Sequence, residues 1–233
     1  MIKPATIEAI KIIAHALGEL NNNAVFVGGA TLPFYIPEIY FSQVRPTEDI
    51  DVVMEILGPY QNSINEESLR KKGFKNDTDE GAPICRWKFR DFKIDIMSTD
   101  TSAFGFTNQW YKEGVICSKI VPSLNVDIKI FSLPYFIASK IEAFKSRGQF
   151  DFMGSKDMED IISVLEVSSK EIFEDEFFNT SEKLRQYLKA EFQILLNNSH
   201  FIEAIPGAIF NRLNSVESSN YVRLRMKNFC ETV

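Results

Sequence analysis

The most constraining feature of this sequence is a pair of short apolar runs with glycines beside one and carboxylates beside the other. The first run, residues 24–27, has the length and composition of a buried strand and ends at Gly28. The second run, residues 50–56, carries Asp49 and Asp51 at its start. Because residues two apart in a strand point to the same face, we expect the two carboxylates side by side, close to a glycine turn.

Two interpretations of these carboxylates compete. Like charges repel and strand interiors disfavour aspartate, so packing alone does not favour this arrangement. One interpretation is a strand that enters from a solvated turn, with Asp49 and Asp51 in contact with water. The other is a site for a divalent cation, which turns the repulsion into attraction. The Gly-Gly pair, where a ligand can approach the backbone closely, favours the second interpretation.

Composition and charge limit the classes of function. A chain of 233 residues with 45% hydrophobic and 25% charged residues can form one large domain or two small ones of an ordinary soluble protein. The net charge of -6 argues against charge-driven nucleic-acid binding, although a local basic groove is compatible with it. The three cysteines are widely spaced and form no C-x-x-C motif. This spacing argues against a disulfide framework or a zinc site and predicts a cytoplasmic location.

The order of predicted elements indicates an α/β (α+β) fold, a mixed sheet with flanking helices followed by a helical C-terminal portion. An amphipathic helix is expected over residues 6–20, with Thr6 as its N-cap, and its polar positions exclude a signal peptide or membrane span. Gly58 and Pro59 predict a turn, and Gly73 ends a short helix. Further strands are expected at 87–89, 92–97, 115–121 and 126–131, and helices at 134–146, 156–165, 170–178, 181–196 and from 200 onward. We therefore predict a core domain over 1–131 and a helical domain over 132–233.

A third carboxylate, Asp95, lies in the middle of the predicted strand FKIDIM. A carboxylate among apolar neighbours is expected to be paired or bound to a metal. If this strand pairs beside the one that carries Asp49 and Asp51, the three form a cluster of hard oxygen ligands suited to Mg²⁺ and substrate phosphates. Two such ions, about 3.5–4 Å apart, can bridge the attacking and leaving oxygens of a phosphoryl displacement. The alternative is an ion pair of Asp95 with Lys93 or Arg86.

The ordered set of motifs resembles a known superfamily. A strand, Gly-Gly, a spacer and then Thr47-x-Asp49-hydrophobic-Asp51, with a later Asp on a neighbouring strand, resembles the polymerase-β-like nucleotidyltransferases. VGGATL followed by RPTEDIDVV, and later LPYFIASKIEAFKSRG and SKDMEDIISVL, are similar to the AbiEii/AbiGii toxin-type nucleotidyltransferases. The resemblance covers roughly residues 24–166. The spacer between Gly29 and Asp49 is longer than the family usually shows, and Gly29 stands where the family often has Ser or Thr.

The resemblance implies roles for particular residues. Asp49 and Asp51 would bind the catalytic Mg²⁺ ions, two with a bound NTP, and Asp95 would be the third metal ligand or the base that receives the acceptor's proton. It also implies a set of nucleotide-binding residues: Gly28, Gly29, Thr31, Thr47, Lys140 and Asp157.

Three of the residues in the later motifs also have ordinary structural explanations. Lys140 suits a solvated helix position, Arg147 suits a helix C-terminus, and Asp157 suits the first turn of a helix that Ser155 caps. Asp160 is expected on nearly the same face as Asp157, where it could buttress Lys140 or Arg147.

The expected activity is transfer of a nucleoside monophosphate from an NTP, such as ATP, to an acceptor. The resemblance implies a toxin–antitoxin or phage-defence setting, a cognate antitoxin as partner, and no membrane. RNA, protein and a small molecule all stay open as the acceptor. Two alternatives are an antibiotic-modifying small-molecule nucleotidyltransferase and a catalytically inactive interaction module of the same fold. The aromatic residues between Phe104 and Tyr111 are either a base-stacking pocket or a small satellite core.

Overall fold

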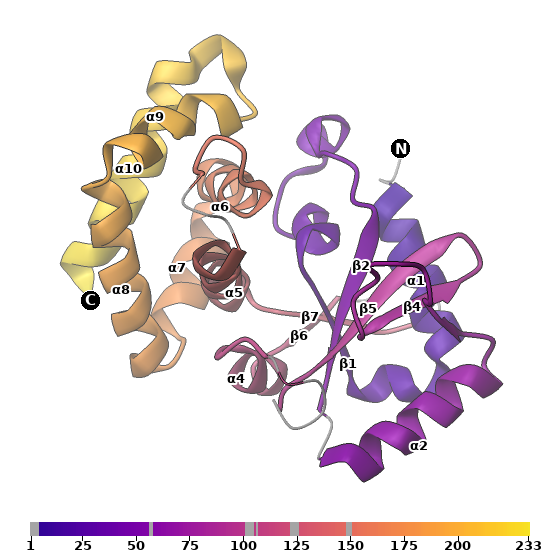
Figure 1. Cartoon of the computed structure of the whole chain (residues 1–233). Coiled ribbons are helices and arrows are strands. Elements are labelled where there is room, and N and C mark those ends of the chain that lie inside the picture. The colour runs from indigo at the N-terminus through magenta and orange to yellow at the C-terminus, as the bar shows by residue number, and fades with distance from the viewer. Residues whose placement is uncertain (1–4, 56–57, 101–104, 106, 122–125, 148–150) are drawn as a thin grey trace. The chain divides into compact units, whose positions relative to one another are not determined.

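The computed structural model describes residues 5–55, 58–100, 105, 107–121, 126–147 and 151–233. The fold is mixed α/β, with a seven-stranded sheet, flanking helices and a helical C-terminal part (Figure 1), which confirms the predicted fold class. The chain forms two compact units, Met1–Thr31 with Arg45–Ser132 and Leu32–Val44 with Leu133–Val233. The predicted domain boundary between residues 131 and 132 stays a prediction. The two compact units differ from the predicted domains because Leu32–Val44 belongs to the second unit.

The first unit contains the sheet, whose strands are ordered β3-β4-β5-β2-β1-β7-β6. Strand β2 pairs in parallel with β5 and antiparallel with β1, and β1 pairs in parallel with β7. The remaining neighbours, β3 with β4, β4 with β5 and β6 with β7, are antiparallel. The strands are β1 Ala24–Val27, β2 Asp49–Met54, β3 Lys75–Asn76, β4 Arg86–Phe89, β5 Phe92–Ser98, β6 Lys119–Val121 and β7 Ile128–Ile130.

The helices divide between the two units. Those of the first unit are α1 Ala5–Leu17, the 3-10 helix η1 Gly18–Asn23, α2 Gly58–Lys71 and α4 Tyr111–Ile116. Two further 3-10 helices, η2 Gly29–Phe34 and η3 Glu38–Gln43, precede β2. The second unit contains α5 Leu133–Arg147, α6 Lys156–Val167, α7 Lys170–Phe178, α8 Glu182–Leu196, α9 Ser199–Ala208, η4 Arg212–Asn214 and α10 Ser215–Thr232.

The two faces of the central strands differ in character. Residues along β2 and β5 point alternately to the two faces of the sheet, and Ile50, Val52 and Ile94 are buried on one of them. Trp87 pairs with Ile94 and points to the same face, and the guanidinium of Arg70 on α2 lies 5.6 Å from its ring centroid. Helix α2 therefore covers the apolar face, and the carboxylates of β2 and β5 lie on the opposite face.

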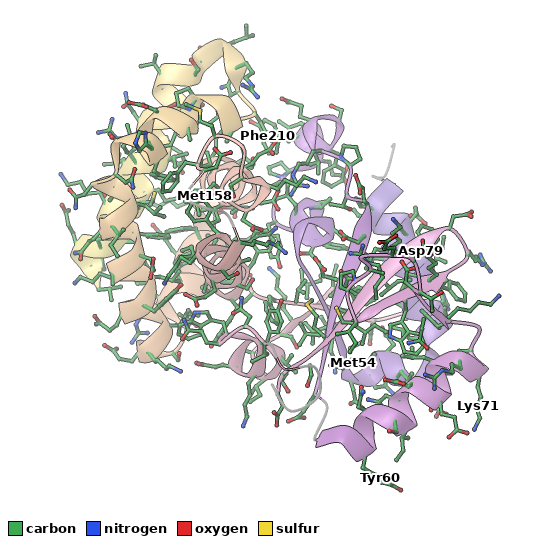
Figure 2. The ribbon with its side chains drawn as sticks, in the orientation of Figure 1. Met54, Tyr60, Lys71, Asp79, Met158 and Phe210 are labelled. Carbon is green, nitrogen blue, oxygen red and sulfur yellow. The ribbon has the colours of Figure 1, made fainter. Side chains whose placement is uncertain are left out.

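The second unit has an aromatic core of its own. Phe173, Phe177, Phe192 and Phe229 are buried, and the ring centroids of Phe177 and Phe229 lie 5.2 Å apart. The segment Leu32–Val44 joins this unit through ring contacts, because the Tyr40 ring stacks on that of Phe210 with centroids 5.3 Å apart. Figure 2 labels Phe210 and Met158 within this helical part.

Several predicted boundaries are wrong. The expected strand over 115–121 begins as helix α4, and only Lys119–Val121 is extended. Gly114 lets helix α4 pack closely on Phe131, since a Cβ there would lie 2.8 Å from the ring. The predicted turn at residues 58 and 59 is the start of α2.

The N-terminal helix also differs from its prediction, and part of the aromatic segment lies outside the described residues. Thr6 lies inside α1 rather than at its cap. Phe104 and Phe106 lie outside the described residues, whereas Trp110 is buried. Within the described parts of the chain, every helix is too short or too polar to cross a membrane.

Candidate functional site

The three predicted carboxylates lie on one face of two adjoining strands. Asp51 on β2 is the direct Cα partner of Asp95 on β5, and Asp49 precedes Asp51 by two residues on the same face. The expected pairing of the two strands is therefore observed. The Asp49 side chain is 38% exposed and that of Asp95 is 12% exposed, so the group extends from solvent into the sheet.

Gly28 lies directly against Asp51. Strand β1 pairs antiparallel with β2, so Val27 is the partner of Asp51 and Gly28 follows it. Gly28 has a φ of 71°, which strongly favours glycine, and a Cβ there would lie 2.0 Å from Oδ2 of Asp51. Both the backbone conformation and the space taken by the carboxylate require glycine at this position.

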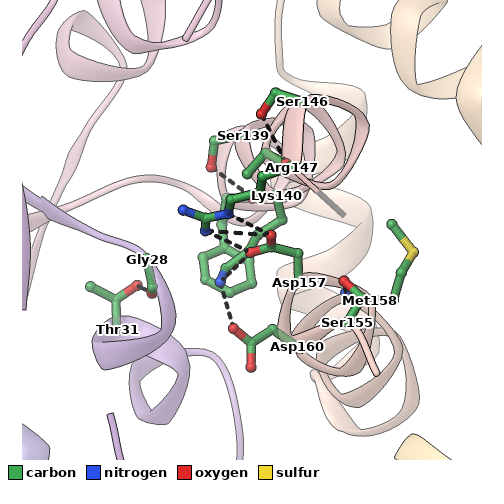
Figure 3. A network of polar contacts seen from close by, with 12 residues as sticks. Gly28, Thr31, Ser139, Lys140, Ser146, Arg147, Ser155, Asp157, Met158 and Asp160 are labelled. Atoms are coloured by element: carbon green, nitrogen blue, oxygen red, sulfur yellow. Dashed lines mark hydrogen bonds and ion pairs between the residues drawn. The ribbon is translucent and has the colours of Figure 1, made fainter. Parts of the chain in front are cut away.

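The other predicted nucleotide contacts of this unit lie around the same turn. Thr31 is buried, and its hydroxyl donates to the Gly28 carbonyl oxygen at 2.9 Å (Figure 3). Gly29 begins η2, and Thr47 is half-buried in the loop before β2. The Thr31 hydroxyl therefore holds the turn closed, and nucleotide binding by these residues stays a prediction.

Arg86 on β4 pairs with two of the carboxylates. Its Nε donates to Asp95 Oδ1 and its Nη2 to Asp95 Oδ2, both at 2.7 Å, which is a bidentate contact. Nη2 also donates to Asp49 Oδ2 at 2.9 Å. The hydrogen bonds to Asp95 and the charges of Asp95 and Asp49 raise the pKa of Arg86, although partial burial opposes this. We call Asp49, Asp51, Asp95 and Arg86 the carboxylate cluster.

The carboxylate cluster fits a magnesium ion in part. Its oxygens are the hard ligands that Mg²⁺ prefers, and Mg²⁺ is usually held by one or two carboxylates together with substrate phosphates. Asp49 and Asp51 meet this description. Asp95 does not fit while Arg86 holds both of its oxygens. Among the described residues, no group of three or more His, Cys, Asp or Glu side chains is arranged to hold a metal.

The predicted site residues of the second unit form a network of ion pairs between α5 and α6. Lys140 on α5 is 6% exposed, and its Nζ lies 2.6 Å from Asp160 Oδ2 and 3.0 Å from Asp157 Oδ1, both on α6 (Figure 3). Arg147, whose side chain is 72% exposed, places its Nε 3.4 Å from Asp157 Oδ2. We call these four residues the lysine cluster.

The lysine cluster is balanced in charge, with two cations and two carboxylates. Burial lowers the pKa of Lys140, but the charges of Asp160 and Asp157 outweigh it and raise the pKa above its ordinary value. The expectation that Asp160 buttresses Lys140 is confirmed, and Ser155 caps α6 as predicted. Both Lys140 and Asp157 are already buried and paired with each other. Contact of either residue with a nucleotide stays a prediction.

Sequence reasoning treated Arg86 only as an alternative partner of Asp95, yet it is central to the geometry. A usable signal was present, since the strands were expected to join across Arg90 and Asp91. A two-residue connection places Phe89 opposite Phe92 and, three positions further along each strand, Arg86 opposite Asp95, which is the observed register. The connection length alone thus predicts this contact.

Comparison with known proteins identifies the fold. No protein-family model matches the sequence, and a search of curated protein sequences finds no match. Among solved structures, an antigenic nucleotidyltransferase-like protein from Paracoccidioides brasiliensis is similar with a TM-score of 0.51 and 17% identity, covering 86% of this chain and 94% of that one. The chain has a nucleotidyltransferase-type fold.

A second solved structure is also similar. JHP933 from Helicobacter pylori has a TM-score of 0.48 and 10% identity, with 100% of this chain and 94% of that chain covered. The first likeness confirms the broad nucleotidyltransferase fold. The narrower resemblance to the AbiEii/AbiGii toxin-type group stays a prediction.

Proposed function

We propose that the chain is a Mg²⁺-dependent nucleotidyltransferase that moves a nucleoside monophosphate from an NTP to an acceptor and releases pyrophosphate. The observation that carries this proposal is the adjacency of Asp51 and Asp95 on one sheet face, with Asp49 beside them and Gly28 packed against Asp51. The fold shared with a nucleotidyltransferase-like protein supports the same class of reaction.

Asp49 and Asp51 would hold the metal and, through it, orient the triphosphate. Bound Mg²⁺ supplies positive charge that offsets the charge of the phosphates and of the departing pyrophosphate. The backbone N–H groups of Gly28 and Gly29 are candidate donors to the same phosphates. Thr31 would act indirectly, by fixing the turn that presents them.

In the proposed reaction, an acceptor oxygen forms a bond to the α-phosphorus while the bond from that phosphorus to the oxygen bridging to the β-phosphorus breaks. Pyrophosphate leaves with the electron pair of the broken bond. The acceptor's proton passes to a base, a role that we assign to Asp95 once Arg86 no longer holds both of its oxygens.

The acceptor and the biological setting rest on the resemblance alone. RNA, protein and a small molecule are all open as acceptors, and a toxin–antitoxin or phage-defence role with a cognate antitoxin is the setting that we propose. The net charge of -6 favours a small cationic acceptor, which is the antibiotic-modifying alternative. The double contact of Arg86 with Asp95 is the observation that favours an inactive interaction module.

The deciding experiment follows a labelled nucleotide. Wild-type protein and an Asp49→Asn/Asp51→Asn variant are incubated with each α-labelled NTP, Mg²⁺ and cellular RNA, protein or small-molecule fractions. An Asp79→Asn variant is the control, because Asp79 is exposed and pairs with Lys88. We expect label in one fraction with the wild type and the control, and none with the double variant. If no fraction gains label that depends on Asp49 and Asp51, the proposal is wrong.

A further inference from the structure

Arg86 occupies three of the carboxylate oxygens of the carboxylate cluster. It takes both oxygens of Asp95 and one oxygen of Asp49, and its side chain is only 18% exposed. A guanidinium and a metal ion cannot share the same oxygen lone pairs at full strength, and their like charges repel at such short range. Metal on Asp49 and Asp51 therefore weakens the hold of the cluster on Arg86.

A displaced Arg86 would have an anion close by. The magnesium nucleotide brings phosphate oxygens to the same sheet face, and the planar guanidinium binds phosphate with the two-pronged geometry that it uses on Asp95. Arg86 lies opposite Asp95 on the neighbouring strand, and Asp95 lies opposite Asp51. The three side chains thus occupy consecutive strands at one level of the sheet.

We propose that Arg86 is a phosphate-binding residue of the site. Asp95 and Asp49 hold its guanidinium until a magnesium nucleotide binds to the carboxylates in its place. This inference rests on the proposed function. Before nucleotide arrives, Arg86 offsets the repulsion among the carboxylates and competes with free metal. After it arrives, Arg86 binds the triphosphate and leaves Asp95 free to accept a proton. Metal and nucleotide therefore bind together more tightly than either binds alone.

The proposal predicts opposite effects of one substitution on two ligands. Without nucleotide, Arg86→Gln should bind Mn²⁺ roughly tenfold more tightly than the wild type, because a competing cation is gone. With saturating Mg²⁺, the same variant should bind a non-hydrolysable NTP analogue roughly tenfold or more weakly, because a charged phosphate donor is lost. Removal of a cation beside the carboxylates tightens metal binding whatever its role, so the loss of nucleotide affinity in the same variant is what identifies Arg86 as a phosphate-binding residue.

The experiment is calorimetric titration of the wild type, Arg86→Gln, Arg86→Lys and the control Arg70→Gln. Arg70 is a more exposed arginine of the same unit that pairs with Glu66. Arg86→Lys keeps the charge beside Asp95 and serves if the glutamine variant does not fold. We expect it to restore much of the nucleotide affinity, and we expect the control to match the wild type in both titrations.

Unchanged or weaker Mn²⁺ binding by Arg86→Gln, or unchanged nucleotide affinity, would overturn the role of Arg86. If metal and nucleotide still bind, and the binding of both is lost in Asp49→Asn/Asp51→Asn, the proposed function stands without a phosphate-binding role for Arg86. If neither the wild type nor Arg86→Gln binds metal or nucleotide, both proposals are wrong.

Discussion

The carboxylate cluster and the lysine cluster are built from the same types of side chain but differ in balance and exposure. In the lysine cluster two cations face two carboxylates, and Asp160 is 1% exposed. The carboxylate cluster has three carboxylates and one guanidinium, which contacts Asp95 and Asp49, and Asp49 is 38% exposed. Buried charges are tolerated only when they are paired, whereas a solvent-accessible excess of negative charge can bind a cation.

This difference separates a structural network from a candidate site. The lysine cluster joins α5 to α6, because Lys140 on α5 pairs with both Asp157 and Asp160 on α6. The carboxylate cluster carries three carboxylates to one guanidinium, and it lies beside the glycine turn at Gly28. If the lysine cluster serves stability and the carboxylate cluster serves ligand binding, substitutions in the two clusters should have different effects.

The largest expected effect is on the lysine cluster. Lys140→Met leaves two buried carboxylates without their shared cation, so the free energy of unfolding should fall by about 3–5 kcal/mol. Urea denaturation followed by circular dichroism measures this loss. Lys145→Met is the control, because Lys145 lies on the same helix with its side chain 43% exposed, and its loss should be below about 1 kcal/mol. Equal losses in the two variants would remove the distinction between buried and exposed pairs.

A smaller effect is expected at the glycine turn. Gly28→Ala and Gly81→Ala both place a side chain at positive φ, 71° and 81°, which costs about 1–2 kcal/mol of stability at each position. Only Gly28 also meets Asp51, since a Cβ at Gly81 has no neighbour within 4 Å. Gly28→Ala should therefore be the less stable of the two and should alone lose magnesium nucleotide binding. Thermal melts and nucleotide titration check this, and matching behaviour of the two variants would argue against a functional turn.

A still smaller stability effect is expected at Asp49. Asp49→Asn removes one half-exposed ion pair, so the free energy of unfolding should change by less than about 1 kcal/mol. The same substitution should abolish metal-dependent nucleotide binding. Parallel denaturation and binding measurements test the pair of outcomes. A large loss of stability with intact binding would place Asp49 in a structural network like that of Lys140.

The smallest effect is a dependence on alkaline pH. Because the folded pKa of Lys140 is raised above the ordinary value of 10.5, its contribution to stability is complete below that pH. As pH rises above 10.5, the unfolded chain releases this proton first, and the contribution declines until the folded pKa is passed. Urea denaturation between pH 9 and about 11.5 should show the gap between the wild type and Lys140→Met narrowing. A constant gap would show that the ammonium charge is not what stabilises this cluster.

The sequence predicted the parts of the fold that depend on local pattern. Alternation of apolar and polar residues predicted the strand of Asp95 and its faces, and capping by Ser155 predicted the start of α6. Helix α4 was missed because its last residues, Val115 and Ile116, are β-branched and typical of strands, and because its packing on Phe131 is a tertiary contact. Local propensity cannot represent a contact between segments that meet only in the fold.

The candidate site could likewise be predicted only in part from the sequence. The shared face of Asp49, Asp51 and Asp95 follows from strand periodicity and one assumed pairing. The pairing of Arg86 with two of these carboxylates required a strand register, which the two-residue connection at Arg90 and Asp91 could have supplied. Burial of Lys140 could not be predicted, because it depends on how α5 packs on α6. Helical spacing shows only which residues share a face.

Paramagnetic broadening by Mn²⁺ tests the central claim most directly. An isotope-labelled protein is titrated with Mn²⁺ and a non-hydrolysable NTP analogue, and the loss of amide signals is followed by residue. We expect early loss of the amide signals of Gly28, Gly29, Asp49, Asp51 and Asp95, and we expect this loss to be suppressed in Asp49→Asn/Asp51→Asn. Broadening that spares these residues, or that persists in the double variant, would contradict the assignment of metal and nucleotide to the carboxylate cluster.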